Sequence, residues 1–118
     1  MKESNISMKI ILLILFFSFL PIKAQIPLSE YNRFKDIDVY KEYIWGVSQG
    51  YSWANANLAG VDEREPLYCQ PPKMLLNRKN IHDMLEREIK DYGHLYPKDG
   101  PLEQILLNAL KRTFPCNN

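Results

Sequence analysis

The sequence is poor in the residues that mark several common classes of protein. It has two histidines, two cysteines and five glycines, and its 15 basic side chains are balanced by 14 acidic ones. A chain this close to neutral lacks the basic field that nucleic-acid-binding domains use. Its 118 residues allow at most one domain of ordinary size, and no self-similar period indicates a repeat protein. We therefore expect neither a two-domain enzyme nor a nucleic-acid partner.

Residues arranged for catalysis or metal binding are also scarce. The sequence contains no phosphate-binding loop, nucleophile elbow or zinc-protease motif. His82 and Glu86 are four residues apart and could share a helix face, but no third ligand accompanies them. Asp62, Glu63 and Glu65 lie in a polar stretch, without the apolar surroundings that a general acid needs. We expect no enzymatic activity, no cofactor and no bound metal ion.

The longest apolar run lies near the amino terminus. Two lysines precede the apolar or small residues Ile10 to Leu20, and a proline and Ala24 follow. This order is typical of a secretory signal peptide that is cleaved after Ala24. The run is about half of the roughly 20 residues that a membrane-spanning helix needs. We predict a signal peptide over residues 1–24 and a mature domain over residues 25–118 that is located in the periplasm, with no membrane association after cleavage.

Both cysteines, Cys69 and Cys116, lie in the predicted mature domain. An even number of cysteines in an exported protein indicates a disulfide. Closing the long loop between them would stabilise the fold by about 4 kcal/mol in the chain-entropy model. The alternative, a catalytic thiol, lacks a base nearby in the sequence.

Apolar residues recur at helical spacing in three segments of the mature chain. The predicted helices cover residues 39–60, residues 78 or 81 to 92, and residues 101–114. Candidate N-caps are Asp36 or Asp38 for the first helix and Asn77 or Asn80 for the second. The stripes expected to face the core are Tyr40, Ile44, Val47, Tyr51, Ala54 and Leu58; Ile81, Met84, Leu85, Ile89 and Tyr92; and Leu102, Ile105, Leu106, Ala109, Leu110 and Phe114. The opposite side of the second helix, which carries Asp83, Glu86, Arg87, Lys90 and Asp91, is expected to be solvated.

These segments predict an all-α fold, a small bundle of three to four helices. Residues 25–37 are either an irregular lead-in or a short extra helix. Cys69 precedes the second predicted helix and Cys116 follows the third, so an antiparallel pair of these helices would bring the two cysteines together. The expected bundle is therefore stapled by one disulfide, Cys69–Cys116.

Small residues recur on the first predicted helix. Gly46, Gly50 and Ala54 are spaced by four, and each helical glycine costs about 1 kcal/mol relative to alanine. Close approach of another helix backbone would explain them, and that helix belongs either to the same chain or to a second copy. Trp45 and Trp53 lie beside this groove and are core or interface anchors. Together these five residues form a predicted homodimer seam.

Three short segments carry a resemblance to a known family. They are Tyr43 to Ser48 (YIWGVS) leading to Ala54 to Ala56, Cys69 to Pro72 (CQPP), and Ala109 to Cys116 (ALKRTFPC). Over residues 38–116 the chain resembles the Rap/Tai-type immunity proteins associated with type VI secretion. The resemblance implies a small, periplasmic, mainly helical, disulfide-stapled homodimer that binds and blocks a peptidoglycan amidase effector.

An inhibitor of this kind needs a projecting surface rather than catalytic groups. Two loops could provide it, and the alternative for each is an ordinary solvated connection. The candidate partner-binding residues are Asp62, Glu63, Arg64, Glu65, Leu67 and Tyr68 in the first loop and Leu95 and Tyr96 in the second. We therefore predict an amidase-inhibiting immunity protein. A periplasmic helical chaperone or another binding protein sharing the fold is the alternative, and a small exported hydrolase is disfavoured.

Overall fold

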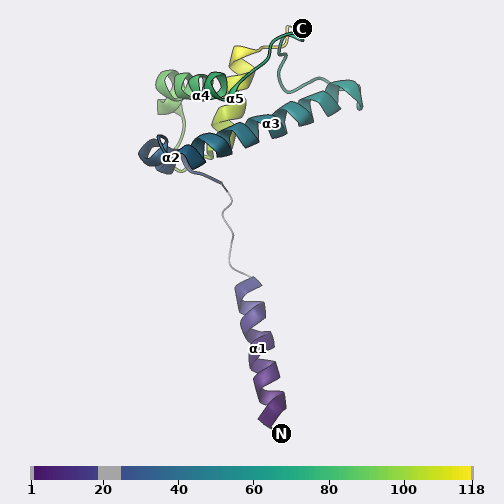
Figure 1. Ribbon diagram of the computed structural model, residues 1–118, viewed down its shortest axis with the longest axis vertical. Coiled ribbons are helices and arrows are strands. Elements are labelled where there is room, and N and C mark those ends of the chain that lie inside the picture. The colour runs from purple at the N-terminus through teal and green to yellow at the C-terminus, as the bar shows by residue number, and fades with distance from the viewer. Residues whose placement is uncertain (1, 19–24, 118) are drawn as a thin grey trace.

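The computed structural model describes residues 2–18 and 25–117, and it confirms the all-α class (Figure 1). Four α-helices form the body: α2 (Leu28–Phe34), α3 (Asp38–Gly60), α4 (Arg78–Tyr92) and α5 (Leu102–Thr113). A 3₁₀ turn, η1 (Gly93–Leu95), follows α4, and a further helix, α1 (Lys2–Ser18), lies in the predicted signal peptide. Residues 25–37 thus contain the short extra helix that the sequence left open.

Helix α1 stands apart from the other helices (Figure 1). Its described apolar side chains, from Ile6 to Ile14, are exposed. Within the described ranges, no helix is both long enough and apolar enough to cross a membrane. Every buried side chain of the described residues lies between Leu28 and Phe114, so residues 25–118 contain the whole core of the domain. The predicted cleavage site at Ala24 lies outside the described residues.

The helix ends show which of the predicted capping residues are used. Asn77 caps α4: its side chain accepts from the Asn80 backbone N–H at 2.8 Å, and the Asn80 side chain accepts from the Asn77 N–H in return. Helix α3 differs from the prediction, because Ile37 occupies its N-cap position without a side-chain cap and Asp38 lies in the first turn. Helix α5 begins at Leu102, one residue later than predicted, because the Pro101 backbone is extended.

The core is built around α5. All six residues of its predicted stripe are buried, and the α4 stripe contributes Ile81, Met84 and Leu85. Burial of side chains of this size is worth about 1.5–3 kcal/mol each, so this cluster is the main source of stability. The α3 stripe was predicted less well: Ala54 is exposed, whereas Ser48 is buried and Asn55 is half-buried. These polar side chains lie inward because each bonds backbone groups, Ser48 donating to the Trp45 carbonyl at 2.7 Å.

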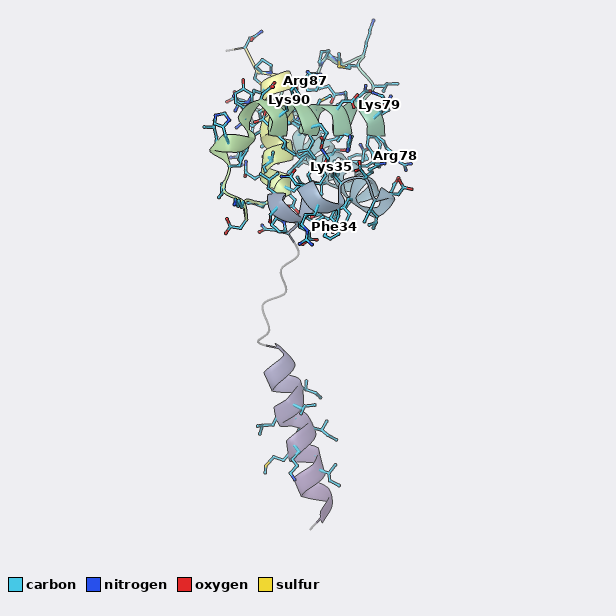
Figure 2. The ribbon with its side chains drawn as sticks, turned by 90° about the vertical axis from the view of Figure 1, so that its left-hand side faces the viewer. Phe34, Lys35, Arg78, Lys79, Arg87 and Lys90 are labelled. Atoms are coloured by element: carbon cyan, nitrogen blue, oxygen red, sulfur yellow. A yellow bond between two sulfur atoms is a disulfide. The ribbon has the colours of Figure 1, made fainter. Side chains whose placement is uncertain are left out.

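Helices α3, α4 and α5 cross one another steeply, as Figures 1 and 2 show. The expected antiparallel pairing of α4 and α5 is therefore wrong, but the predicted disulfide is confirmed. Cys69 and Cys116 are bonded, with their Cα atoms 4.9 Å apart. They meet because the chain before α4 runs past the end of α5, where the Cys69 N–H donates to the Phe114 carbonyl at 2.8 Å.

Opening this disulfide should destabilise the domain strongly. The bridge closes a loop of 47 positions, so replacing both cysteines by serine should cost about 4 kcal/mol and lower the thermal midpoint by roughly 15–30 °C. Circular dichroism melts of oxidised, reduced and double-serine protein provide the measurement, with the reduced protein as the matched control. Equal midpoints for all three would contradict the prediction, as would two alkylatable thiols in denatured, unreduced protein.

Candidate partner-binding surface

The loop after α3 divides into an exposed tip and a buried stem. Asp62, Glu63, Arg64 and Glu65 are exposed, and Glu63 has a positive φ of 51°. The tip is held to the end of α3, because the Arg64 N–H donates to the Leu58 carbonyl at 2.8 Å. These four charged residues are therefore displayed at the surface, as predicted.

The stem of the same loop belongs to the core. Tyr68 is only 3% exposed and its ring lies against Phe114, and Leu67 is half-buried. Asn55 of α3 holds both, accepting from their backbone N–H groups and donating to the Tyr68 carbonyl at 2.7 Å. Tyr68 is thus not the projecting anchor that the sequence predicted, because its aromatic ring gains more by packing on α5.

Tyr96 in the second predicted loop is half-buried, and its hydroxyl is held by two hydrogen bonds. Its hydroxyl donates to Glu88 Oε1 at 2.6 Å and accepts from Asn108 at 3.0 Å. Glu88 is 3% exposed, and the Arg112 guanidinium pairs with it at 3.1 Å. The sequence interpretation missed Glu88, although its position three residues after Leu85 lies on the buried face of α4. Of the two candidate residues in this loop, Leu95 is the exposed one, at 66%.

The predicted dimer seam lies on the outer face of α3. A Cβ atom built at Gly46 or at Gly50 would meet nothing within 4 Å, so none of the helices described here approaches the groove. This excludes the intrachain contact that the sequence left open. Trp53 is 73% exposed, Ala54 is exposed and Trp45 is half-buried. In addition, α3 has no charged residue from Tyr43 to its end, which is unusual for a helix exposed on one side.

A third loop, residues 70–76, presents a side chain that the sequence interpretation did not single out. Leu75 is 91% exposed and Met74 is 43% exposed. The loop is fixed, because the Gln70 side chain donates to the Met74 carbonyl at 2.6 Å and the Met74 N–H donates to the Pro71 carbonyl at 3.0 Å. The diproline after Cys69 and the α4 cap at Asn77 were the available signals of rigidity.

Two hollows border this loop. The smaller, about 180 Å³, lies between the loop and α3; its lining includes Trp45, Gln49, Met74 and Leu75. The larger, about 490 Å³, separates it from the stem of the Asp62–Glu65 loop; its lining includes Pro66 and Pro72. The two loops and the α3 surface between them therefore form one continuous irregular surface.

The face formed by α2 and α4 is basic but partly neutralised (Figure 2). Carboxylates pair with three of its labelled cations, Lys35 with Glu86 at 2.8 Å, Arg78 with Glu42 at 3.2 Å and Lys79 with Asp83 at 2.6 Å. Glu86 was expected to be solvated, but it is half-buried. It also accepts from the Tyr31 hydroxyl at 2.6 Å, and His82 lies 3.3 Å from the same hydroxyl. Among the described residues, no group of three His, Cys, Asp or Glu side chains could hold a metal ion.

We compared the chain with known protein families, proteins and structures. No family model, no curated protein and no solved structure matches the chain. The three segments that carry the resemblance lie in α3, in the loop after Cys69 and at the end of α5, and the disulfide joins the last two.

The Glu86 cluster should make stability depend on pH. Burial opposes the charge of Glu86, but hydrogen bonds from Lys35 and Tyr31 outweigh it and lower its pKa. This contribution is therefore present above the unfolded pKa of about 4.3 and is lost as pH falls through the folded pKa. Glu86→Gln should be less stable than wild type by about 1 kcal/mol at pH 7, and urea unfolding should show the difference shrinking below about pH 4. Glu42→Gln, which changes an exposed ion pair, is the control, and a pH-independent difference would contradict the assignment.

Proposed function

We propose that the mature chain is an exported immunity protein that binds and inhibits a peptidoglycan amidase. The family resemblance motivates the proposal, and the confirmed disulfide is consistent with an oxidising compartment. The structural observation that carries it is the exposed Leu75 on a fixed loop. An apolar side chain held away from the core in a rigid loop is suited to fill a cleft in another protein.

The geometry supports binding by a preformed surface. Fixing the loop before association reduces the ordering cost of binding, which otherwise offsets part of the contact energy. The stem residue Pro66 lines the larger hollow on the side opposite this loop, and the exposed charged tip Asp62–Glu65 that precedes it would supply polar contacts at the edge of an interface. Leu75 takes the anchor role expected of Tyr68 and Tyr96, whose side chains are held in the body.

The anchor can be tested by a pair of matched substitutions. Leu75→Asp should weaken amidase binding by at least ~2 kcal/mol, about 30-fold, because interface energy concentrates in a few buried anchors. Leu95→Asp makes the same chemical change at an exposed leucine of the other loop and should leave affinity within about threefold. Calorimetry with purified exported amidases measures the affinity, beginning with any amidase encoded beside this chain. Inhibition is measured as the decrease in the amount of peptidoglycan fragments that the amidase releases.

The possible outcomes test the choice of anchor loop and the immunity function separately. A loss confined to Leu95→Asp would transfer the anchor to the second loop. If no amidase binds the unmodified protein, the immunity function fails, and capture of many unfolded clients would favour the chaperone alternative.

We further propose that the outer face of α3 is a homodimer interface. The face has both an exposed large side chain, Trp53, and open space above Gly46 and Gly50. Antiparallel pairing about a two-fold axis between Gln49 and Gly50 would set Trp53 of each copy against Gly46 of the other. This axis lies near the middle of α3, so the central turns of the helix form the contact. The absence of charged residues from Tyr43 to the end of α3 lets two identical faces meet there without like-charge repulsion.

Filling the open space above Gly50 should separate the two copies without unfolding them. Gly50→Leu replaces a poor helix former by a good one at a position with open space, so the monomer should keep its fold. Analytical ultracentrifugation should show a dimer for wild type and a monomer for Gly50→Leu. Gly60→Leu, the same change at another open position at the end of α3, should remain dimeric. A wild-type monomer, or an unchanged dimer in Gly50→Leu, would refute this interface.

A further inference from the structure

The start of the mature domain is tied to the start of α5. Pro27 and Pro101 form an isolated antiparallel bridge. The Leu102 N–H donates to the Ile26 carbonyl at 2.8 Å, and the Leu28 N–H donates to the Gly100 carbonyl at 3.0 Å. The backbone of residues 26–28 is therefore held in place immediately after the predicted cleavage site.

One side chain at this junction is incompletely satisfied. The Glu103 Oε1 atom accepts from the Ile26 N–H at 3.3 Å and from the Tyr43 hydroxyl. The Glu103 Oε2 atom is buried, and among the described residues it has no hydrogen-bond partner. A buried carboxylate oxygen without a donor costs free energy comparable to a lost hydrogen bond to a charged group. The position of Glu103 in the first turn of α5 favours a negative charge there but supplies no donor to Oε2.

We propose that Oε2 of Glu103 is the acceptor for the protonated α-amino group of Gln25, which cleavage after Ala24 creates. Gln25 directly precedes the residue whose N–H already bonds the other oxygen of the same carboxylate. Consecutive Cα atoms are about 3.8 Å apart, so the Gln25 nitrogen is within reach of the carboxylate by rotation of an exposed residue. The inference rests on the export and cleavage in the proposed function.

Cleavage changes the chemistry of the Gln25 nitrogen. In the uncleaved chain it is an amide with one N–H and no charge, whereas after cleavage it is an ammonium with three donors and a positive charge. Hydrogen bonds between ionised groups are about twice as strong as neutral ones. Removal of the signal peptide would then complete the packing of the domain, and the mature form would be more stable than the precursor.

The titratable groups around the Glu103 carboxylate do not compete with the α-amino group for its charge. Among the described residues, two titratable side chains contact Glu103, both from α3: Tyr43, and Tyr51, whose hydroxyl donates to the Glu103 carbonyl at 2.9 Å. Burial, followed by the hydrogen bond to Glu103, raises the pKa of Tyr43 to about 12, and burial raises that of Tyr51. Both tyrosines therefore stay neutral while an α-amino group titrates. Residues 25–27 bring no other ionisable side chain.

The test follows the titration of the amine in residues 25–118, prepared with Gln25 as the first residue. NMR should show the α-amino group of folded protein titrating above about 9, against about 8 for an unpaired terminus. Glu103→Gln keeps an acceptor for Ile26 but removes the charge, and should return the value to about 8. Glu30→Gln changes another carboxylate that accepts from a tyrosine, Tyr40, and should leave the amine unchanged.

Thermal melts supply a second measurement. The pyroglutamate form, in which Gln25 has cyclised, has the same chain but a neutral terminus. The raised pKa of the folded amine means that the free-amine form is stabilised below about pH 8, and that this advantage disappears as pH rises through the folded value. We expect a higher thermal midpoint for the free amine at pH 7, with the two midpoints converging near pH 10.

An amine that titrates near 8 in wild type and Glu103→Gln alike would overturn the inference. So would exported protein whose mass shows a first residue other than Gln25. Amidase binding is a separate measurement: an ordinary amine in a protein that binds amidase defeats only this inference, and a paired amine in a protein that binds none defeats only the proposed function.

Discussion

The attachment of residues 67–69 to the end of α5 is the constraint on which the rest of the surface depends. Three contacts of different kinds make it: the Cys69–Cys116 disulfide, the Cys69 hydrogen bond to Phe114, and the Tyr68 ring against the Phe114 ring. The connection between α3 and α4 is thereby divided into two short loops with fixed ends. Short loops with fixed ends have few conformations, so each presents its exposed side chains in a defined position.

The sequence predicted the buried residues of a helix well where all its large apolar residues lie on one face. On α5 the apolar stripe coincides with the buried face, since all the remaining positions are polar or only partly buried. On α3 the same reasoning failed at Ala54, because small residues carry little information about burial and because Ser48 and Asn55 are drawn inward by backbone hydrogen bonds. The steep crossing of the helices was also beyond the sequence, since periodicity fixes a face and not the direction of its neighbour.

The predicted binding loops show the same limit. Tyr68 and Tyr96 lie in segments rich in proline, glycine and charge, so both were expected at the surface. Tyrosine is amphipathic: the Tyr68 ring packs on Phe114, and the half-buried Tyr96 places its hydroxyl against a polar partner. Four tyrosines donate to glutamates in this way, and the pairs are Tyr31 with Glu86, Tyr40 with Glu30, Tyr43 with Glu103, and Tyr96 with Glu88. Two of these pairs join residues more than 50 positions apart, and none has the spacing of a helix turn, so no local pattern reveals them.

The second half of α3 differs in kind from the rest of the body. After Tyr51 it has no fully buried side chain, and it extends beyond α4 and α5 in Figure 1. Asn55 attaches it to the loop stem through hydrogen bonds rather than through apolar packing. Local opening of a helix needs little free energy where few apolar contacts are lost. We therefore expect amide hydrogens at this end of α3 to exchange with solvent by local opening, and those of α5 to exchange only when the whole domain unfolds.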